Sequence, residues 1–146
     1  MAEPRPDFSG KWTVVRIEGD MDAFLKESGV SWMVRKMASG MGYGVGKQKQ
    51  DIAHSGDQLE IVNESPMGKV TITMVINGQE QTAVTPDNEK VLATPCWEPD
   101  GATLRVESRK PNGGAVPLQR RFMRGDEMVM ELTSPKGTAV SRIFSR

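Results

Sequence analysis

The sequence predicts an all-β fold, built from ten short antiparallel strands with a single helical segment near the N-terminus. Short runs alternate apolar and polar residues, as expected for strands with one buried face. Clusters of Gly, Pro, Asn and Asp separate these runs about every ten residues, a spacing typical of β-sandwiches and up-and-down β-barrels. The length predicts a single domain over residues 1–146.

The expected strands follow from this alternation. The first covers residues 8–17, where Trp12 and Val14 alternate with polar neighbours. The other nine come after residue 46, at 47–53, 58–63, 69–76, 80–84, 90–93, 103–108, 116–123, 127–132 and 138–144. Because no long crossover is needed, sequential antiparallel pairing is the simplest topology. Ten such strands usually close on themselves, which removes exposed edges.

The segment 20–41 changes its period and predicts two short helices. Apolar residues recur at helical spacing on both sides of Gly29, which is a natural helix stop. Asp20 can cap the first helix and Ser31 the second, because their side-chain oxygens accept free backbone N–H groups. Residues 1–7 are rich in Pro and charge and are expected to form a flexible tail.

The composition excludes several classes of protein. The chain has 19 Lys and Arg against 19 Asp and Glu, so it lacks the basic surplus of a sequence-independent nucleic-acid binder. Its single cysteine, Cys96, excludes an internal disulfide and suits a reducing compartment. Its single histidine, His54, excludes a two-His metal site within the chain. No secretory signal and no apolar run of about 20 residues is found, so the expected location is the cytoplasm.

Two of the expected strands place an arginine among apolar neighbours. Arg142 shares a strand face with Phe144, and Arg120 shares a face of an earlier strand with Leu118. If these faces are interior, both cations need compensation from water, an acidic side chain or an anionic ligand. A guanidinium fork matches a carboxylate in this role. The opposite strand parity, or a position at an open rim, remains an alternative.

The strand at 127–132 has a clearer parity. Glu131 is expected to face water, because a carboxylate is rarely buried without a partner. Met130 and Leu132 are therefore expected to face the barrel interior.

Three blocks of the sequence resemble the intracellular lipid-binding protein family, which includes fatty-acid-binding and cellular retinoid-binding proteins. Residues 8–12 resemble the family's F-x-G-x-W start, and residues 21–36 resemble its helical lid. Residues 137–144 resemble its terminal strand, which carries an R-x-Y motif. The resemblance implies a ten-stranded up-and-down barrel of the calycin, lipocalin-like type. It also implies a two-helix lid between the first two strands and a solvated ligand cavity.

The resemblance further implies a carboxylate site inside the barrel. Arg142 occupies the position of the family's carboxylate-binding arginine, and Arg120 corresponds to its partner two strands earlier. Phe144 stands where many members have a ligand-binding tyrosine, so the ring is kept but the O–H donor is lost. The expected ligand-binding residues of the strands are Arg120, Arg142, Phe144, Leu118, Met130 and Leu132.

A gate between lid and barrel is the expected entry route, because hydrogen-bonded strands do not admit a ligand. Met67 falls near the family's portal phenylalanine, and Met33 and Met37 lie on the second lid helix. Phe24 on the first lid helix completes the expected gate, whose methionines suit an adaptable surface. Ordinary packing of these side chains on the barrel is the alternative.

The lid also carries positive charge. Lys26, Arg35 and Lys36 are candidates for contact with an anionic membrane during ligand transfer, and a plain solvated helix face is the alternative. A monomer is expected, because a closed barrel has no long edge to pair with another chain.

The predicted function is non-covalent binding and intracellular transport of a long-chain fatty acid or a similar hydrophobic carboxylate, without a cofactor or a metal ion. The alternatives are a different apolar cargo, such as a retinoid, a sterol or bile acid, haem or a pigment, and an interaction module with a filled interior. A lipid-modifying enzyme is disfavoured. His54 lies beside a turn with no second histidine, and Cys96 lacks an evident base.

Overall fold

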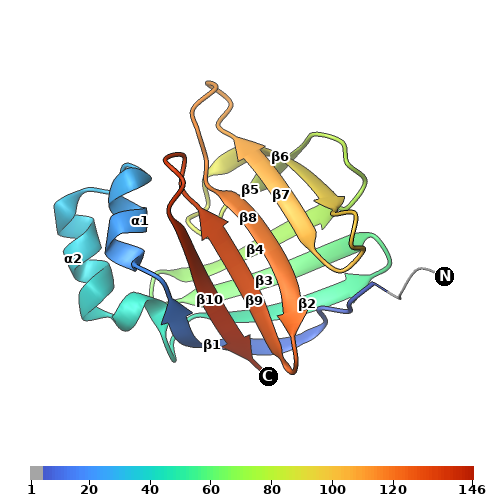
Figure 1. Ribbon diagram of the computed structural model, residues 1–146, viewed down its shortest axis with the longest axis horizontal. Helices are drawn as coiled ribbons and strands as arrows, with labels where there is room; N and C mark the ends of the chain where they lie inside the picture. Colours follow the sequence, from blue (N-terminus) through green and yellow to red (C-terminus); the bar gives the residue numbers. More distant parts are fainter. Residues whose placement is uncertain (1–4) are drawn as a thin grey trace.

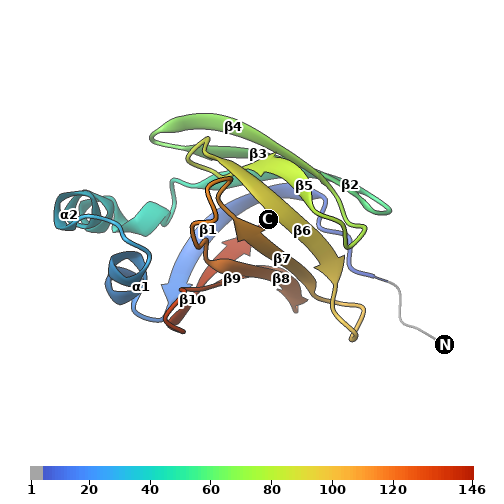
Figure 2. The same cartoon turned by 90° about the horizontal axis from the view of Figure 1, so that it is seen from above.

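Ten antiparallel strands form one continuous sheet that curls into a nearly closed barrel (Figures 1 and 2). The computed structural model describes residues 5–146. The strands are β1 (Gly10–Glu18), β2 (Lys49–Ser55), β3 (Gln58–Ser65), β4 (Gly68–Val75), β5 (Gln81–Val84), β6 (Lys90–Trp97), β7 (Leu104–Arg109), β8 (Leu118–Arg124), β9 (Glu127–Thr133) and β10 (Ala139–Ser145). The predicted ten-stranded antiparallel barrel is confirmed, with boundaries that differ from the expected ranges by a few residues.

Pairing of the first and last strands, β1 and β10, makes the ten strands one continuous sheet. The sheet order is β4-β3-β2-β1-β10-β9-β8-β7-β6-β5. Within residues 5–146, β4 and β5 form no ladder with each other, so the expectation that closure removes every edge is wrong at this place. The side-chain amide of Gln81 replaces part of the missing ladder. Its Oε1 accepts from Val75 N at 2.8 Å, and its Nε2 donates to Val75 O at 2.8 Å.

The barrel interior is tightly filled at one end and less so at the other. At the end remote from the helices, Trp12, Val14, Met128 and Phe144 are at most 1% exposed. At the helical end, Leu132 faces inward opposite the buried Val140 but is itself only half-buried. Apolar burial thus stabilises the end of the barrel remote from the helices.

Two helices and a short 3₁₀ turn lie between β1 and β2, as predicted for residues 20–41. These are α1 (Met21–Glu27), α2 (Trp32–Gly40) and η1 (Gly42–Gly44). The expected caps form: Asp20 Oδ1 accepts from Ala23 N at 3.0 Å, and Ser31 Oγ accepts from Val34 N at 3.4 Å. The helix α1 lies beside the barrel, whereas α2 is the outermost element of the molecule on that side (Figure 1).

The two helices differ in how they pack. Met21 and Phe24 of α1 are buried in a cluster with Val140 of β10. No residue of α2 is buried. The barrel therefore anchors α1 but leaves α2 largely in contact with solvent.

The N-terminal segment contacts the filled end of the barrel. Residues 1–4 of the tail expected at 1–7 lie outside the described residues. Arg5 donates to Asp57 Oδ1 at 3.2 Å and lies 5.2 Å from the ring centroid of Trp97. In the chain from residue 5 onward, no helix has the length and apolar character needed to cross a membrane.

Gly19, which joins β1 to α1, provides a test of how tightly this junction packs on β10. Its φ is +99°, and a Cβ there would lie 2.9 Å from Ala139 O. We expect Gly19→Ala to lower the free energy of unfolding by about 2–4 kcal/mol, because backbone strain adds to a backbone clash. Urea denaturation monitored by tryptophan fluorescence measures this loss.

Gly29→Ala is the matched control. Gly29 has a φ of +86°, but a Cβ there would meet nothing within 4 Å. We expect a loss of only about 1 kcal/mol from the backbone conformation alone. Equal losses in the two variants would show that the contact with β10 is not responsible.

Candidate functional site

Two arginines face the interior of the barrel from β8 and β10. Arg121 of β8 and Arg142 of β10 both lie opposite Met130 of β9. Directly opposed residues of antiparallel strands share a face of the sheet. Met130 is 4% exposed and belongs to the core cluster. The register therefore places both guanidinium groups on the interior face, on the two strands that flank Met130 of β9.

Arg121 is bound by neutral acceptors. It is 1% exposed, and its Nη1 donates to Gln50 Oε1 at 2.9 Å and to Met128 Sδ at 3.3 Å. Its Nη2 donates to Met130 Sδ at 3.5 Å, while its buried Nε has no partner among the described residues. Burial lowers the pKa of Arg121 to about 10, so the side chain is still a cation at neutral pH.

Arg142 has still less compensation. Its buried Nε has no hydrogen-bond partner, and no ion pair joins it to any residue from 5 to 146. Burial lowers the pKa of Arg142, and the charge of Asp87 in the β5–β6 turn opposes this shift. A guanidinium offers five N–H donors, so Arg142 retains most of its capacity to bind an acceptor.

A chain of amides continues from Arg121 through Gln50 of β2 and Asn63 of β3 to Gln48, which directly precedes β2. Gln50 Nε2 donates to Asn63 Oδ1 at 3.2 Å, and Gln48 Nε2 donates to the same oxygen at 3.0 Å. All three amide residues are buried. The sequence analysis did not predict these three residues as part of the site. The alternation of Gln48 and Gln50 with lysines was a usable signal, because lysines favour the outer face of a strand and the glutamines between them then face inward.

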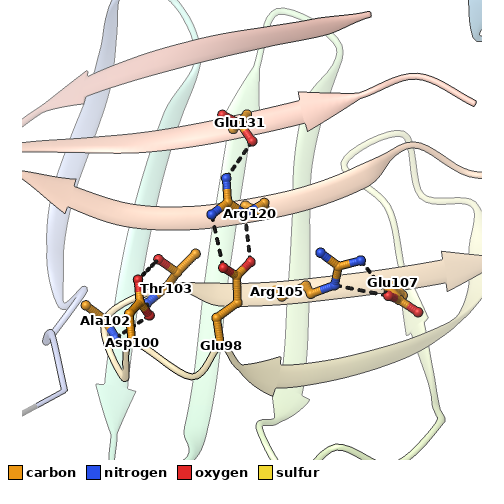
Figure 3. A network of polar contacts seen from close by, with 8 residues as sticks. All are labelled: Glu98, Asp100, Ala102, Thr103, Arg105, Glu107, Arg120 and Glu131. Atoms are coloured by element: carbon orange, nitrogen blue, oxygen red, sulfur yellow. Dashed lines mark hydrogen bonds and ion pairs between the residues drawn. The ribbon is translucent and has the colours of Figure 1, made fainter. Parts of the chain in front are cut away.

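The prediction that Arg120 and Leu118 face the interior is wrong. Arg120 lies on the outer face, where Nε and Nη2 donate to Glu98 at 2.7 and 3.0 Å and Nη1 donates to Glu131 at 2.8 Å (Figure 3). Leu118 has the same parity as Arg120 and lies on the same face. The physical reason is the two-residue period of a strand: an error of one residue exchanges the two faces, so Arg121 is the interior arginine.

The other predicted strand residues do face inward. Phe144 is fully buried opposite Met128 and Val14, and Leu132 lies opposite Val140. Met130 separates the two interior arginines. Their contact with a ligand stays a prediction.

The four expected gate residues are not brought together. Phe24 of α1 is buried in the cluster with Val140 of β10. Met33 and Met37 on α2 are 68% and 56% exposed. Met67, in the β3–β4 turn, is 83% exposed. Because α2 does not pack on the barrel, its methionines do not reach the interior in this arrangement.

The outer ion pair of Arg120 predicts a pH dependence of stability. Hydrogen bonds from Arg120 hold the pKa of Glu98 below its usual value of 4.5. A carboxylate with a depressed pKa stabilises the fold above its unfolded pKa, and this contribution is lost as the pH falls through the folded pKa. We expect Arg120→Met to lower the free energy of unfolding by about 1–2 kcal/mol at pH 7. The difference from wild type should shrink below about pH 4.

Urea denaturation at neutral and acidic pH tests this expectation. Arg109→Met is the control, because the Arg109–Glu80 pair is more exposed, with side-chain exposures of 51% and 45%. It should show a smaller loss at pH 7. A loss in Arg120→Met that is the same at both pH values would assign the effect to packing rather than charge.

Comparison with known proteins finds similar sequences and a solved structure with the same fold. A scan against models of protein families finds no match. The chain is 27% identical over 141 residues to cellular retinoic acid-binding protein 1 of Hippocampus comes, covering 97% of this chain and 98% of the relative. It is also 27% identical over 143 residues to cellular retinoic acid-binding protein 2 of Mus musculus, covering 97% and 99%.

A solved structure agrees with these relatives. The REP1-NXSQ fatty acid transporter superimposes with a TM-score of 0.76 and 26% identity over 96% of both chains. All three names are those of binding or transport proteins rather than enzymes. The sequence motifs, the barrel and these relatives together confirm the resemblance of this chain to the intracellular lipid-binding protein family.

Proposed function

We propose that the barrel binds and carries a long-chain fatty acid or a similar hydrophobic carboxylate, whose head group is held by Arg142 and Arg121. The observation that carries this proposal is the pair of interior guanidinium groups, neither of which forms an ion pair with a carboxylate of residues 5–146. Retinoic acid and fatty acids, which appear in the names of the similar proteins, are both hydrophobic carboxylates. We propose a monomeric carrier that works in the cytoplasm.

The apolar interior supplies most of the binding free energy. Each buried methylene contributes about 0.8 kcal/mol, so a chain of about fifteen contributes about 12 kcal/mol before costs. Loss of translation and ordering of the chain offset several kcal/mol of this gain. The ion pair with the carboxylate then fixes the orientation of the ligand and selects against uncharged analogues.

The two arginines contribute unequally to this selection. Arg121 already donates to Gln50 and two thioethers, whereas Arg142 is free to donate. Phe144, without an O–H group, offers no third donor. Arg142 is therefore the principal anchor of the proposed head-group site.

The Arg142→Met variant tests this role. It keeps an apolar side chain of similar length but removes the cation. We expect it to weaken binding of palmitate and retinoic acid about 10- to 100-fold, because a charge-assisted pair is lost. The corresponding alcohols should change less than about threefold. Displacement of an apolar fluorophore by each ligand gives the dissociation constants.

Arg120→Met is the control, because it removes a neighbouring arginine of the outer face. It should leave both ligand classes unaffected. Equal weakening of acids and alcohols by Arg142→Met would contradict the ion pair. If the cargo is a retinoid, a sterol or a pigment, that ligand should displace the fluorophore at a lower concentration than palmitate does.

We also propose that α2 contacts an anionic lipid surface when the ligand is transferred. Trp32, Met33 and Val34 of α2 are between 53% and 68% exposed, which is unusual for apolar side chains of this size. Lys36 lies 4.9 Å from the ring centroid of Trp32. An apolar group with a cation beside it fits the boundary between acyl chains and anionic head groups.

Vesicle sedimentation tests the lipid contact. The double variant Trp32→Ser/Met33→Ser should bind vesicles of phosphatidylcholine and phosphatidylserine at least about fivefold more weakly than wild type, because buried apolar area is lost. Val75→Ser, which removes a 43% exposed side chain from β4, should bind like wild type. Equal binding by all three proteins, or binding that does not depend on phosphatidylserine, would contradict the proposal.

A further inference from the structure

We infer that a neutral residue at position 50 is required for an anionic ligand: Gln50 binds Arg121 without adding charge, so neither interior cation forms an ion pair with a side chain of residues 5–146. This inference rests on the proposed function and assigns a specificity-determining role to position 50, which lies across the barrel from Arg121.

The contact between Gln50 and Arg121 crosses the barrel. Gln50 is on β2 and Arg121 on β8, and β1, β10 and β9 separate these strands in the sheet. The two side chains nevertheless meet at 2.9 Å, and both are at most 2% exposed. Only side chains that extend inward from different walls make such a contact.

Neighbouring amides fix which end of Gln50 faces the guanidinium. Its Nε2 donates to Asn63 Oδ1, an oxygen that also accepts from Gln48 Nε2. Gln50 Oε1 is therefore directed at Arg121 Nη1. The amide chain thus satisfies a donor of Arg121 with a dipole and adds no charge.

A neutral partner has a direct consequence for binding. The remaining contacts of Arg121 are the thioethers of Met128 and Met130, which are weak acceptors without charge. A carboxylate at position 50 would neutralise Arg121 through a charge-assisted hydrogen bond. A ligand carboxylate would then bring a second negative charge to the same site, whereas a ligand alcohol would not.

The Gln50→Glu variant tests the inference. We expect it to weaken palmitate and retinoic acid at least about 30-fold, because an internal anion competes for the guanidinium. The corresponding alcohols should change less than about threefold, so the preference for acids over alcohols falls. Fluorophore displacement gives the ratio of the dissociation constants for the alcohols and the acids. A general loss of packing would weaken both ligand classes alike and leave this ratio unchanged.

Two controls isolate the contact with Arg121. Gln50→Leu removes the amide without adding charge and should keep the preference for acids within about fivefold of wild type. Asn63→Asp adds a carboxylate one strand away from the contact and should lower the preference less than Gln50→Glu does. An unchanged ratio in Gln50→Glu, or an equal fall in Asn63→Asp, would overturn the role of Gln50.

A measurement on the wild-type protein applies if Gln50→Glu does not fold. Calorimetric titration of palmitate at pH 7 in phosphate and in Tris buffer reports protons taken up on binding. We expect none, because the uncompensated cations bind the ligand as an anion. Uptake of one proton would overturn the inference.

The outcomes also separate this inference from the proposed function. If wild type does not prefer acids over alcohols, the proposed head-group site fails. If wild type prefers acids and Arg142→Met abolishes that preference but Gln50→Glu retains it, only the role of Gln50 fails.

Discussion

The antiparallel register of β8, β9 and β10 is the constraint on which the proposed site depends. Opposed residues share a face, so the inward direction of Met130 alone places Arg121 and Arg142 inside the barrel. A shift of one residue in β8 would bring Arg120 inside instead. The outer carboxylates of Glu98 and Glu131 oppose that shift, because Arg120 bonds to both of them. An outer ion-pair network therefore supports the position of an inner cation.

The interior compensates its two cations unequally, and this inequality suggests how a ligand is held. Arg121 is satisfied in part by an amide and two thioethers, whereas Arg142 keeps its donors. Burial of an unpaired cation is unfavourable, so an anion that enters the barrel relieves a penalty already present in the fold. The filled apolar end, with Trp12 and Phe144, provides a rigid base beneath these polar groups.

The lid has one anchored and one free element. The helix α1 buries Met21 and Phe24 against β10, while α2 buries none of its residues and is connected to η1 and then to β2. Segments with few buried apolar contacts open at low free-energy cost. Motion of α2 is therefore compatible with an intact barrel, and its exposed apolar side chains are available to a lipid surface.

Local pattern was sufficient for the number of strands, the two capped helices at 20–41 and the inward direction of Met130 and Leu132. For Arg142 it left both parities open, and the resemblance of the terminal strand to the family motif indicated the interior. Local pattern failed at Arg120 and Arg121. Adjacent strand residues face opposite sides of the sheet, so one arginine faces inward whichever way the strand is oriented, and the local pattern does not show which one. The tight turn between β8 and β9, combined with an inward Met130, contained the information that Arg121 faces inward. The missing β4–β5 ladder, the exposure of α2 and the contact of Gln50 with Arg121 were decided by the tertiary structure alone. Each depends on how distant segments approach in space, whereas the sequence periodicity reports only which face of its own element a residue occupies.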